Sequence, residues 1–220
     1  RGLWMMGTKF IYERTGAGLF NCAFRSTREL STKGGYLFAW MMDALMVGIG
    51  VGFDTLGAGT VTIKEPQYSD ETYIVPDSRE GWVNSVRILL DGFFLGKKIP
   101  NFDYSIIRPP GSLIKGFGGT ASGHGPLEEL HNDLKELYTG KVGEAITSVD
   151  IVDTENLIGR CVVAGNVRRS AALALGQFDD KDYLTMKNDE KKLYHHRWGS
   201  NNSFEAKVGM DYTWHAEQSQ

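Results

Sequence analysis

The stretch that decides the fold runs from Tyr36 to Phe53 and reads YLFAWMMDALMVGIGVGF. Residues 36–47 have the apolar spacing of a buried helix, with Asp43 as the one charged residue. Glycine then alternates with apolar residues over 48–53, which predicts a glycine-punctuated strand. Asp43 and the glycines also interrupt the stretch before it reaches the roughly 20 apolar residues that span a bilayer. We therefore expect a buried helix that leads directly into a strand.

Helices and strands alternate on both sides of this stretch, which indicates an α/β protein. The expected helices are 77–94, with Asp77 or Ser78 as its cap, then 127–138, 148–164 and an exposed helical region at 179–196. The expected strands are 3–6, 19–24, 105–107 and 170–175, with a hairpin or an extended arm at 60–75.

Composition excludes several classes of protein. The 220 residues are 23% charged and 41% hydrophobic, which is typical of a soluble globular protein. A net charge of -3 gives no basic surface for nucleic acid, and neither a signal peptide nor a membrane span is predicted. Two cysteines do not make a secreted disulfide framework, so we expect a reducing, cytoplasmic setting.

A glycine-rich loop occupies residues 114–123, where four of ten residues are glycine. Glycine lets backbone amides adopt positive φ and approach a ligand closely. Arg108 and Lys115 add positive charge at the edge of the loop, as expected where a loop meets phosphate. From these residues alone the loop is either a phosphate-binding loop or a flexible turn.

Three other groups of residues are candidates for chemistry. Cys22 is either a packed small hydrophobe or a redox thiol, whereas Cys161 lies in an apolar helix and is interpreted as structural. Arg168 and Arg169 precede a strand of small apolar residues. They are interpreted as a solvated strand entry, as a buried ionic network or as an anion site. The pair at 195–196 lacks further ligands at metal spacing, so no metal site is predicted.

Six motifs in order carry a resemblance to a known family. They are Asn21-Cys22, residues 48–53, Pro76 to Trp82, Ile107 to Leu127, Ala164 to Ala171 and Ser200 to Ser203. Together they resemble the adenosylcobalamin-dependent (class II) ribonucleotide reductases, particularly the monomeric ribonucleoside-triphosphate type. The resemblance runs from Arg1 to about Tyr212. It implies the first half of a ten-stranded α/β barrel, with residues 1–220 forming a partial barrel domain that is incomplete at both ends.

The resemblance implies reduction of ribonucleotides, with triphosphates favoured, by a cobalamin-initiated thiyl-radical mechanism. Cys22 matches one of two cysteines that supply electrons and form a disulfide, its partner being absent from this chain. Asn21, Cys22 and Gly48 match positions near the substrate. A thioredoxin-type protein is the implied reductant, acting through tail cysteines outside this chain.

The resemblance also implies allosteric control by deoxynucleotides. Segments of about 34–46 and 53–126 match effector-binding regions, and the glycine-rich loop matches the loop that connects effector and substrate sites. The implied effector-binding residues are Asp43, Arg108, Lys115, Gly116, Gly118, Gly119, Thr120 and Ser122.

Other family features are missing from the sequence. The Asn-Pro-Cys-x-Glu radical loop, the second reducing cysteine, the tail cysteines and most of the adenosylcobalamin site are not found in it. The sequence therefore predicts a reductase fragment that is inactive by itself. Two alternatives remain, namely a non-catalytic nucleotide-binding module that retains the effector loop, and a degenerate fragment with an exposed strand edge.

Overall fold

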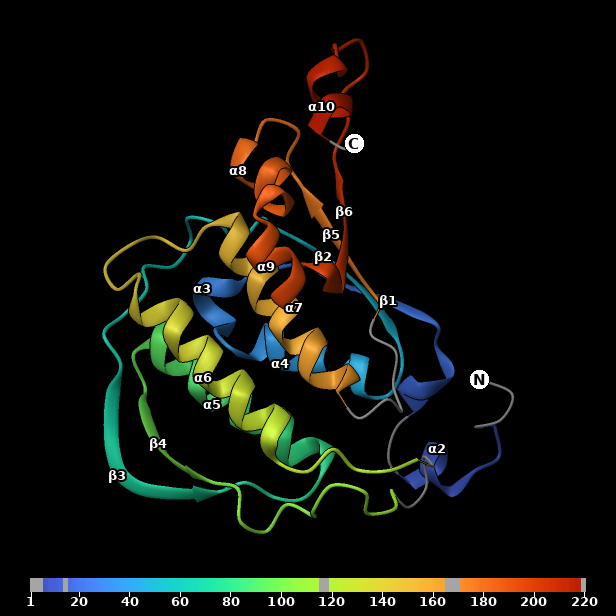
Figure 1. Cartoon of the computed structure of the whole chain (residues 1–220), viewed down its shortest axis with the longest axis vertical. Coiled ribbons are helices and arrows are strands. Elements are labelled where there is room, and N and C mark those ends of the chain that lie inside the picture. Colours follow the sequence, from blue (N-terminus) through green and yellow to red (C-terminus); the bar gives the residue numbers. More distant parts are fainter. Residues whose placement is uncertain (1–5, 14–15, 115–118, 165–170, 219–220) are drawn as a thin grey trace.

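Four parallel strands form the sheet around which the chain is built (Figure 1). The computed structural model describes residues 6–13, 16–114, 119–164 and 171–218. The strands are β1 (Cys22–Arg25), β2 (Gly50–Asp54), β5 (Ala172–Gly176) and β6 (Ser200–Phe204), in the order β1-β2-β5-β6. The predicted α/β class is confirmed, and the strands expected at 19–24, 48–53 and 170–175 are present with shifted ends.

Two layers of helices lie on one side of this sheet. Helices α4 (Tyr36–Met46) and α7 (Ser148–Val163) contact β2 and β5, while α5 (Arg79–Leu95) packs on α4 and α6 (Gly125–Thr139) packs on α7. Figure 1 shows the four helices stacked beside the sheet. All four were predicted from apolar periodicity and end signals.

The remaining helical elements are short. The predicted exposed helical region 179–196 is divided into separate short helices, within which Tyr183 and Met186 are buried. No helix among the described residues is long and apolar enough to cross a membrane. The short elements are α2 (Lys9–Glu13), η1 (Gly16–Leu19), α3 (Leu30–Lys33), α8 (Lys181–Thr185), η2 (Met186–Asn188), α9 (Glu190–His195), η3 (Arg197–Gly199) and α10 (Thr213–Gln218).

A second, two-stranded sheet lies beyond α5. Strands β3 (Gln67–Ile74) and β4 (Lys98–Asp103) pair in parallel, with α5 as the connection between them. The hairpin considered for 60–75 is therefore wrong, and its extended alternative is closer to the structure. The strand expected at 105–107 is also wrong, because β4 ends at Asp103 and the chain turns over the next residues.

In the described part of the chain, the face of the four-stranded sheet opposite α4 and α7 is exposed. Phe24, Gly52, Leu173 and Asn201 are neighbours across the four strands, and Phe24 and Leu173 are 53% and 39% exposed. Because side chains alternate along a strand, Cys22 lies on the same face as Phe24. Parallel sheets are normally covered on both faces, so this open face is unusual for the fold class.

Buried polar contacts attach the last strand to α7. Asp153 of α7 accepts hydrogen bonds from both Nε and Nη2 of Arg197 at 2.7 Å, and Nε2 of His196 lies 3.0 Å from its carboxylate. Burial alone would raise the pKa of Asp153, but these partners lower it below its usual value. The residues that precede β6 are therefore held on the central helix by an ionised carboxylate.

Helices α4 and α5 touch at Gly34 and Gly35, the two residues that precede α4. A Cβ on Gly35 would lie 2.7 Å from both the Arg87 carbonyl oxygen and the Leu90 Cβ of α5. The amide of Gly35 donates to the buried Asp91 carboxylate at 2.9 Å. The close approach of the two backbones therefore depends on the absence of a side chain at this position.

We expect Gly35→Ala to lower the free energy of unfolding by about 1–3 kcal/mol, because the added methyl group has no space against α5. The measurement is urea unfolding followed by circular dichroism. Gly140→Ala is the matched control, since its φ is also negative and its nearest neighbour would be 3.7 Å away. Equal stability of the two variants would contradict the packing argument.

Candidate functional site

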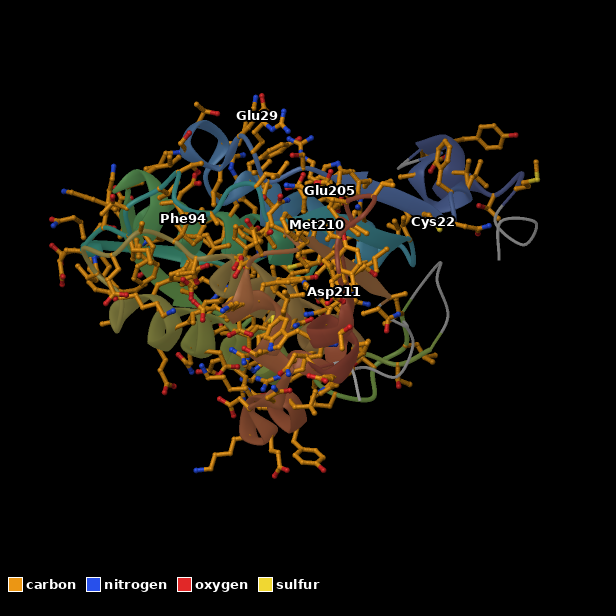
Figure 2. All side chains as sticks on the ribbon, turned by 90° about the horizontal axis from the view of Figure 1, so that it is seen from above. Cys22, Glu29, Phe94, Glu205, Met210 and Asp211 are labelled. Atoms are coloured by element: carbon orange, nitrogen blue, oxygen red, sulfur yellow. The ribbon has the colours of Figure 1, made fainter. Side chains whose placement is uncertain are left out.

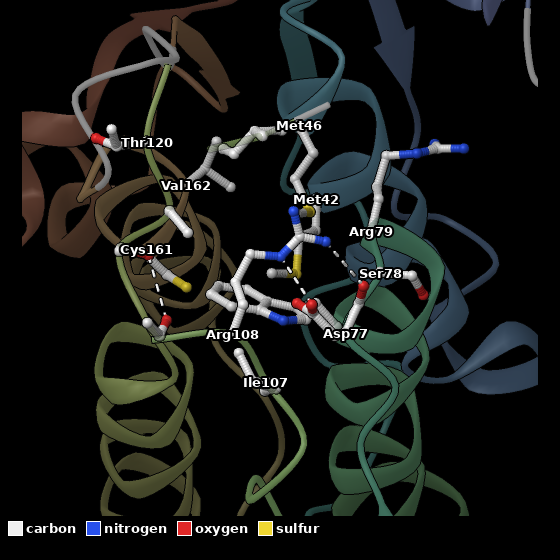
Figure 3. Close-up of a pocket in the computed structure, with 15 residues that line it drawn as sticks. Met42, Met46, Asp77, Ser78, Arg79, Ile107, Arg108, Thr120, Cys161 and Val162 are labelled. Atoms are coloured by element: carbon white, nitrogen blue, oxygen red, sulfur yellow. Dashed lines mark hydrogen bonds and ion pairs between the residues drawn. The ribbon is translucent and has the colours of Figure 1, made fainter. Parts of the chain in front are cut away.

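A half-open cavity of ≈ 120 Å³ lies where α4, α5, α7 and the glycine-rich segment meet (Figure 3). Its wall combines thioether, indole and aliphatic side chains with two arginines and one carboxylate. The volume is below the about 300–1,000 Å³ of typical small-molecule sites. A ligand of nucleotide size therefore requires this wall to open. The lining residues are Met42, Met46, Asp77, Ser78, Arg79, Trp82, Ile107, Arg108, Ile114, Thr120, Ala121, Ser122, Gly123, Cys161 and Val162.

The described ends of the glycine-rich segment are paired with each other through backbone hydrogen bonds and one isolated bridge. The Gly111 amide donates to the Ala121 carbonyl at 2.9 Å, and the Ala121 amide donates to Ser112 at 2.7 Å. The Ile114 amide donates to Gly119, whose φ of 88° favours glycine. We refer to residues 111–114 and 119–121 as the arm. The tip of the loop, with Lys115, Gly116 and Gly118, lies outside the described residues.

Arg108 at the base of the arm is held by Asp77 of the segment that precedes α5. Its Nε donates to the Asp77 carboxylate at 2.7 Å, and its Nη2 lies 3.4 Å from the Asp77 carbonyl oxygen. Its Nη1 reaches the carbonyl of Leu113 in the arm at 3.4 Å. In Figure 3 the guanidinium and the carboxylate face each other inside the cavity.

Asp43 lies beside the cavity, paired with one of its lining residues. Arg79 donates to the Asp43 carboxylate and also to Glu80 at 2.8 Å. Burial raises the pKa of Asp43, and the Arg79 guanidinium opposes that rise. The structure therefore brings Arg108, Thr120 and Ser122 together in one wall and places Asp43 one ion pair away.

A buried histidine joins α6 to α5 and to the segment between β4 and the arm. His131 of α6 lies with Nδ1 2.6 Å from the Tyr104 hydroxyl and Nε2 3.1 Å from Ser85 Oγ. Because Ser85 Oγ donates to the Trp82 carbonyl at 2.7 Å, it must accept the Nε2 proton, which leaves Nδ1 to accept from Tyr104. Desolvation lowers the pKa of His131 to about 3, with a smaller contribution from Lys135. The ring is therefore neutral and tied to both α5 and the segment after β4.

A histidine with a lowered pKa makes folding sensitive to acid. The unfolded chain takes up a proton near the ordinary pKa of 6.5, whereas the folded chain takes it up near 3. We therefore expect the free energy of unfolding to fall as the pH is lowered from about 6.5, by up to about 1.4 kcal/mol per pH unit from this residue.

Urea titrations between pH 4 and pH 7.5 measure this dependence, and His131→Gln should make it shallower. His124→Gln, at a half-exposed histidine next to the same helix, is the control for removing a histidine that is not buried. Parallel slopes for the wild type and His131→Gln would rule out the contribution of the buried ring.

Of the residues expected at the substrate, Cys22 lies on the sheet and Asn21 and Gly48 lie just before its strands, apart from the cavity. Cys22 begins β1, is exposed, and is paired in register with Gly50, while the Gly50 amide donates to the Asn21 carbonyl at 2.9 Å. Figure 2 shows Cys22 near the α2 end of the molecule, far from Phe94. Gly48, with a φ of 85°, ends α4 in a Schellman motif, because its amide donates to Leu45 and that of Ile49 donates to Ala44.

Sequence reasoning missed part of the cavity wall. Met42, Met46 and Trp82 fall in the segments that the resemblance assigned to effector binding but were not named as site residues, and Cys161 was interpreted only as packing; all four line the cavity. Asp77 was interpreted as a possible helix cap, but Ser78 is the cap and accepts from the Gly81 amide at 3.0 Å. The sequence did offer one signal for Asp77: it is an acidic residue directly before a serine that can cap the helix in its place. Arg168 and Arg169 lie outside the described residues.

Among the described residues, one cluster of potential metal ligands is present on the helical side. Ligand atoms of Glu129, Asp133 and His195 lie within 4.8 Å of one another. The Arg160 guanidinium contacts all three, at 3.0 Å from Glu129 and 2.5 Å from His195, with a further hydrogen bond to Asp133. The positively charged Arg160 side chain therefore already pairs with all three potential ligands.

Comparisons with known proteins agree with one another. A family model described as "B12-dependent ribonucleotide reductase, insertion domain" matches residues 54–138, which include α5 and the arm. An adenosylcobalamin-dependent ribonucleoside-triphosphate reductase of Euglena gracilis is 46% identical over 97% of this chain and 30% of the relative. A relative of the same name from Lactobacillus leichmannii is 39% identical over 92% of this chain and 34% of the relative.

A solved structure extends the likeness to the fold. The crystal structure of a B12-dependent (class II) ribonucleotide reductase matches with a TM-score of 0.80 and 34% identity, over 94% of this chain and 36% of that chain. The parallel sheet, the helical layers and the arm are therefore a portion of a ribonucleotide reductase fold. Within that class, the chain belongs to the adenosylcobalamin-dependent, class II family. It spans about a third of the length of the relatives that it matches.

Proposed function

We propose that this chain is the effector-binding and first substrate-contacting part of an adenosylcobalamin-dependent ribonucleoside-triphosphate reductase. The observation that carries the proposal is the cavity between α4, α5, α7 and the arm, since residues expected at the effector gather in it. The 46% identity to a reductase of that name supports the reaction class. On this proposal the complete protein acts in the cytoplasm on ribonucleoside triphosphates.

The wall chemistry of the cavity suits a deoxynucleoside triphosphate. Trp82, Met42 and Met46 offer flat and polarisable surfaces for a base, and Arg108 offers a guanidinium to a phosphate. Thr120 and Ser122 add hydroxyl groups from the arm. The segments 34–46 and 53–126 are thereby assigned to effector binding. Lys115, Gly116, Gly118 and Gly119 remain assigned to effector binding as well.

Helix α4 supplies a path from this cavity to the substrate residues. Met42 and Met46 line the cavity, and the same helix ends at Gly48, two residues before β2. β2 pairs with β1 at Gly50 and Cys22. On this proposal a ligand that binds one position of α4 more tightly than another biases the strand beside Cys22, and such differential binding is what allosteric control requires. The arm offers a second path, through its contact with the base of a bound nucleotide.

We assign Cys22 a redox role in the reaction. Replacing the ribose 2′-hydroxyl by hydrogen releases water and consumes two electrons and two protons. Two thiols supply them when they become a disulfide. Cys22 is exposed on the open sheet face, whereas Cys161 is buried in the cavity wall, so the partner thiol comes from outside this chain, as does the thioredoxin-type contact that reduces the disulfide again. Asn21 and Gly48 are assigned to the neighbourhood of the same substrate.

The described residues do not fit adenosylcobalamin itself. Their best-formed cavities measure ≈ 120, ≈ 470 and ≈ 540 Å³, and none is a surface on the scale of a corrin ring with its adenosyl group. We therefore extend the cofactor named for the relatives to the complete protein, with a site mostly outside this chain, and derive no step through it from these residues.

Direct binding tests the effector site. We expect isothermal titration calorimetry to detect binding of at least one of dATP, dGTP, dCTP and dTTP to the chain. Arg108→Ala should weaken that binding by about ten- to a hundredfold, because a charge-assisted hydrogen bond to phosphate is lost. Arg28→Ala, at an exposed arginine outside the cavity, is the control. A folded chain that binds none of the four nucleotides would refute the effector site.

A chimera tests the redox role of Cys22. This chain would replace the segment to which it aligns in the Euglena gracilis reductase. The chimera should reduce ribonucleoside triphosphates with adenosylcobalamin and a dithiol, and Cys22→Ser should abolish multiple turnover, because serine cannot form a disulfide. Unchanged deoxynucleotide binding shows that the variant is folded. Full turnover of Cys22→Ser would favour the alternative, a nucleotide-binding module without a redox role.

A further inference from the structure

Asp77 is a carboxylate in the wall of a cavity that we assign to an anionic ligand. Its partner among the described residues is Arg108, with Nε donating to the carboxylate at 2.7 Å. A fixed negative charge repels a triphosphate, so its presence beside Arg108 requires an explanation. In Figure 3 the two side chains lie in direct contact in the wall of the cavity.

Helix capping does not account for this carboxylate. Ser78 is the N-cap of α5 and accepts from the Gly81 amide at 3.0 Å, so the position is already served. Asp77 precedes the cap and its carboxylate is directed to the guanidinium instead. The function of this side chain therefore concerns Arg108.

The ion pair is suited to exchange. The Arg108 and Asp77 side chains are 36% and 31% exposed, and ion pairs exposed to this degree contribute little to stability. A phosphate group carries more charge than a carboxylate and presents several acceptor oxygens to the same planar donor. A polyphosphate can therefore take the guanidinium from Asp77 at small cost.

Arg108 also connects this pair to the arm. Its Nη1 is 3.4 Å from the Leu113 carbonyl. The internal hydrogen bonds of the arm do not use this carbonyl. With the pair in place the cavity is only ≈ 120 Å³, too small for a nucleotide. Movement of the guanidinium away from Asp77 changes the support of the arm at the point where the cavity must open.

We propose that Asp77 is an internal substitute for the ligand phosphate, which holds Arg108 and the arm in the closed position until a polyphosphate displaces it. This proposal rests on the proposed effector site and adds its regulation. It makes Asp77 a competitor of the ligand rather than a contact to it. The carboxylate thereby selects for occupants that carry several negative charges, such as nucleoside triphosphates, over nucleosides.

The experiment uses Asp77→Asn and, as a matched control, Asp70→Asn, which removes the same charge from an exposed position of β3. Tripolyphosphate and the four deoxynucleoside triphosphates are titrated by calorimetry. The ¹⁵Nε–¹H signal of Arg108 is followed by NMR in the same samples. We expect Asp77→Asn to bind tripolyphosphate about two- to fivefold more tightly than the wild type, and Asp70→Asn to bind as the wild type does.

The NMR signal separates this proposal from the effector site itself. In the wild type, tripolyphosphate should move the Arg108 signal away from its ion-paired position, and Asp77→Asn should shift it before any ligand is added. Weaker binding to Asp77→Asn, or a wild-type Arg108 signal that tripolyphosphate does not move, overturns the proposal. If tripolyphosphate gives the expected result and no deoxynucleotide binds, the effector site fails while the exchange of Asp77 stands.

Discussion

The close contact of α4 with α5 is the constraint on which the rest of the helical layers depends. Gly35 brings the start of α4 against the end of α5. There the Asp91 carboxylate accepts a hydrogen bond from the Gly35 amide and forms an ion pair with Lys97 at 2.8 Å. The two helices are antiparallel, so their opposite ends frame the cavity with Met46 on one side and Ser78 on the other. A fixed contact at one end and a hollow at the other allow the cavity end to respond to a ligand.

Two sites of different character result from this arrangement. The helical side offers a small cavity with an apolar wall and a guanidinium, whereas the sheet side offers an open face with an exposed thiol. One continuous segment joins them, because α4 lines the cavity and ends in the turn at Gly48 that leads to β2. Such a connection suits a protein in which one nucleotide controls how another is handled.

The elements that the sequence predicted well are those with strong local signals. Helices α4, α5, α6 and α7 combine apolar periodicity with defined ends, such as the Thr147–Asp150 capping box of α7. Strand pairing was predicted less well, since it depends on contacts between distant segments. Residues 67–74 pair in parallel with β4 across a helix, and nothing in their alternation distinguishes that arrangement from a hairpin. The strand expected at 105–107 failed because Tyr104 is held by His131, where the chain leaves the sheet.

The sequence by itself determined the fold class, the four long helices and, through six ordered motifs, the family. The family resemblance carried by these motifs also pointed to Arg108, Thr120 and Ser122 as residues of one effector site. Only the tertiary structure decided which distant residues complete that site, since Met42, Trp82 and Cys161 come from three helices. It also decided that Arg108 is already paired with Asp77, because an ion pair between residues 31 positions apart depends on how the chain folds in space.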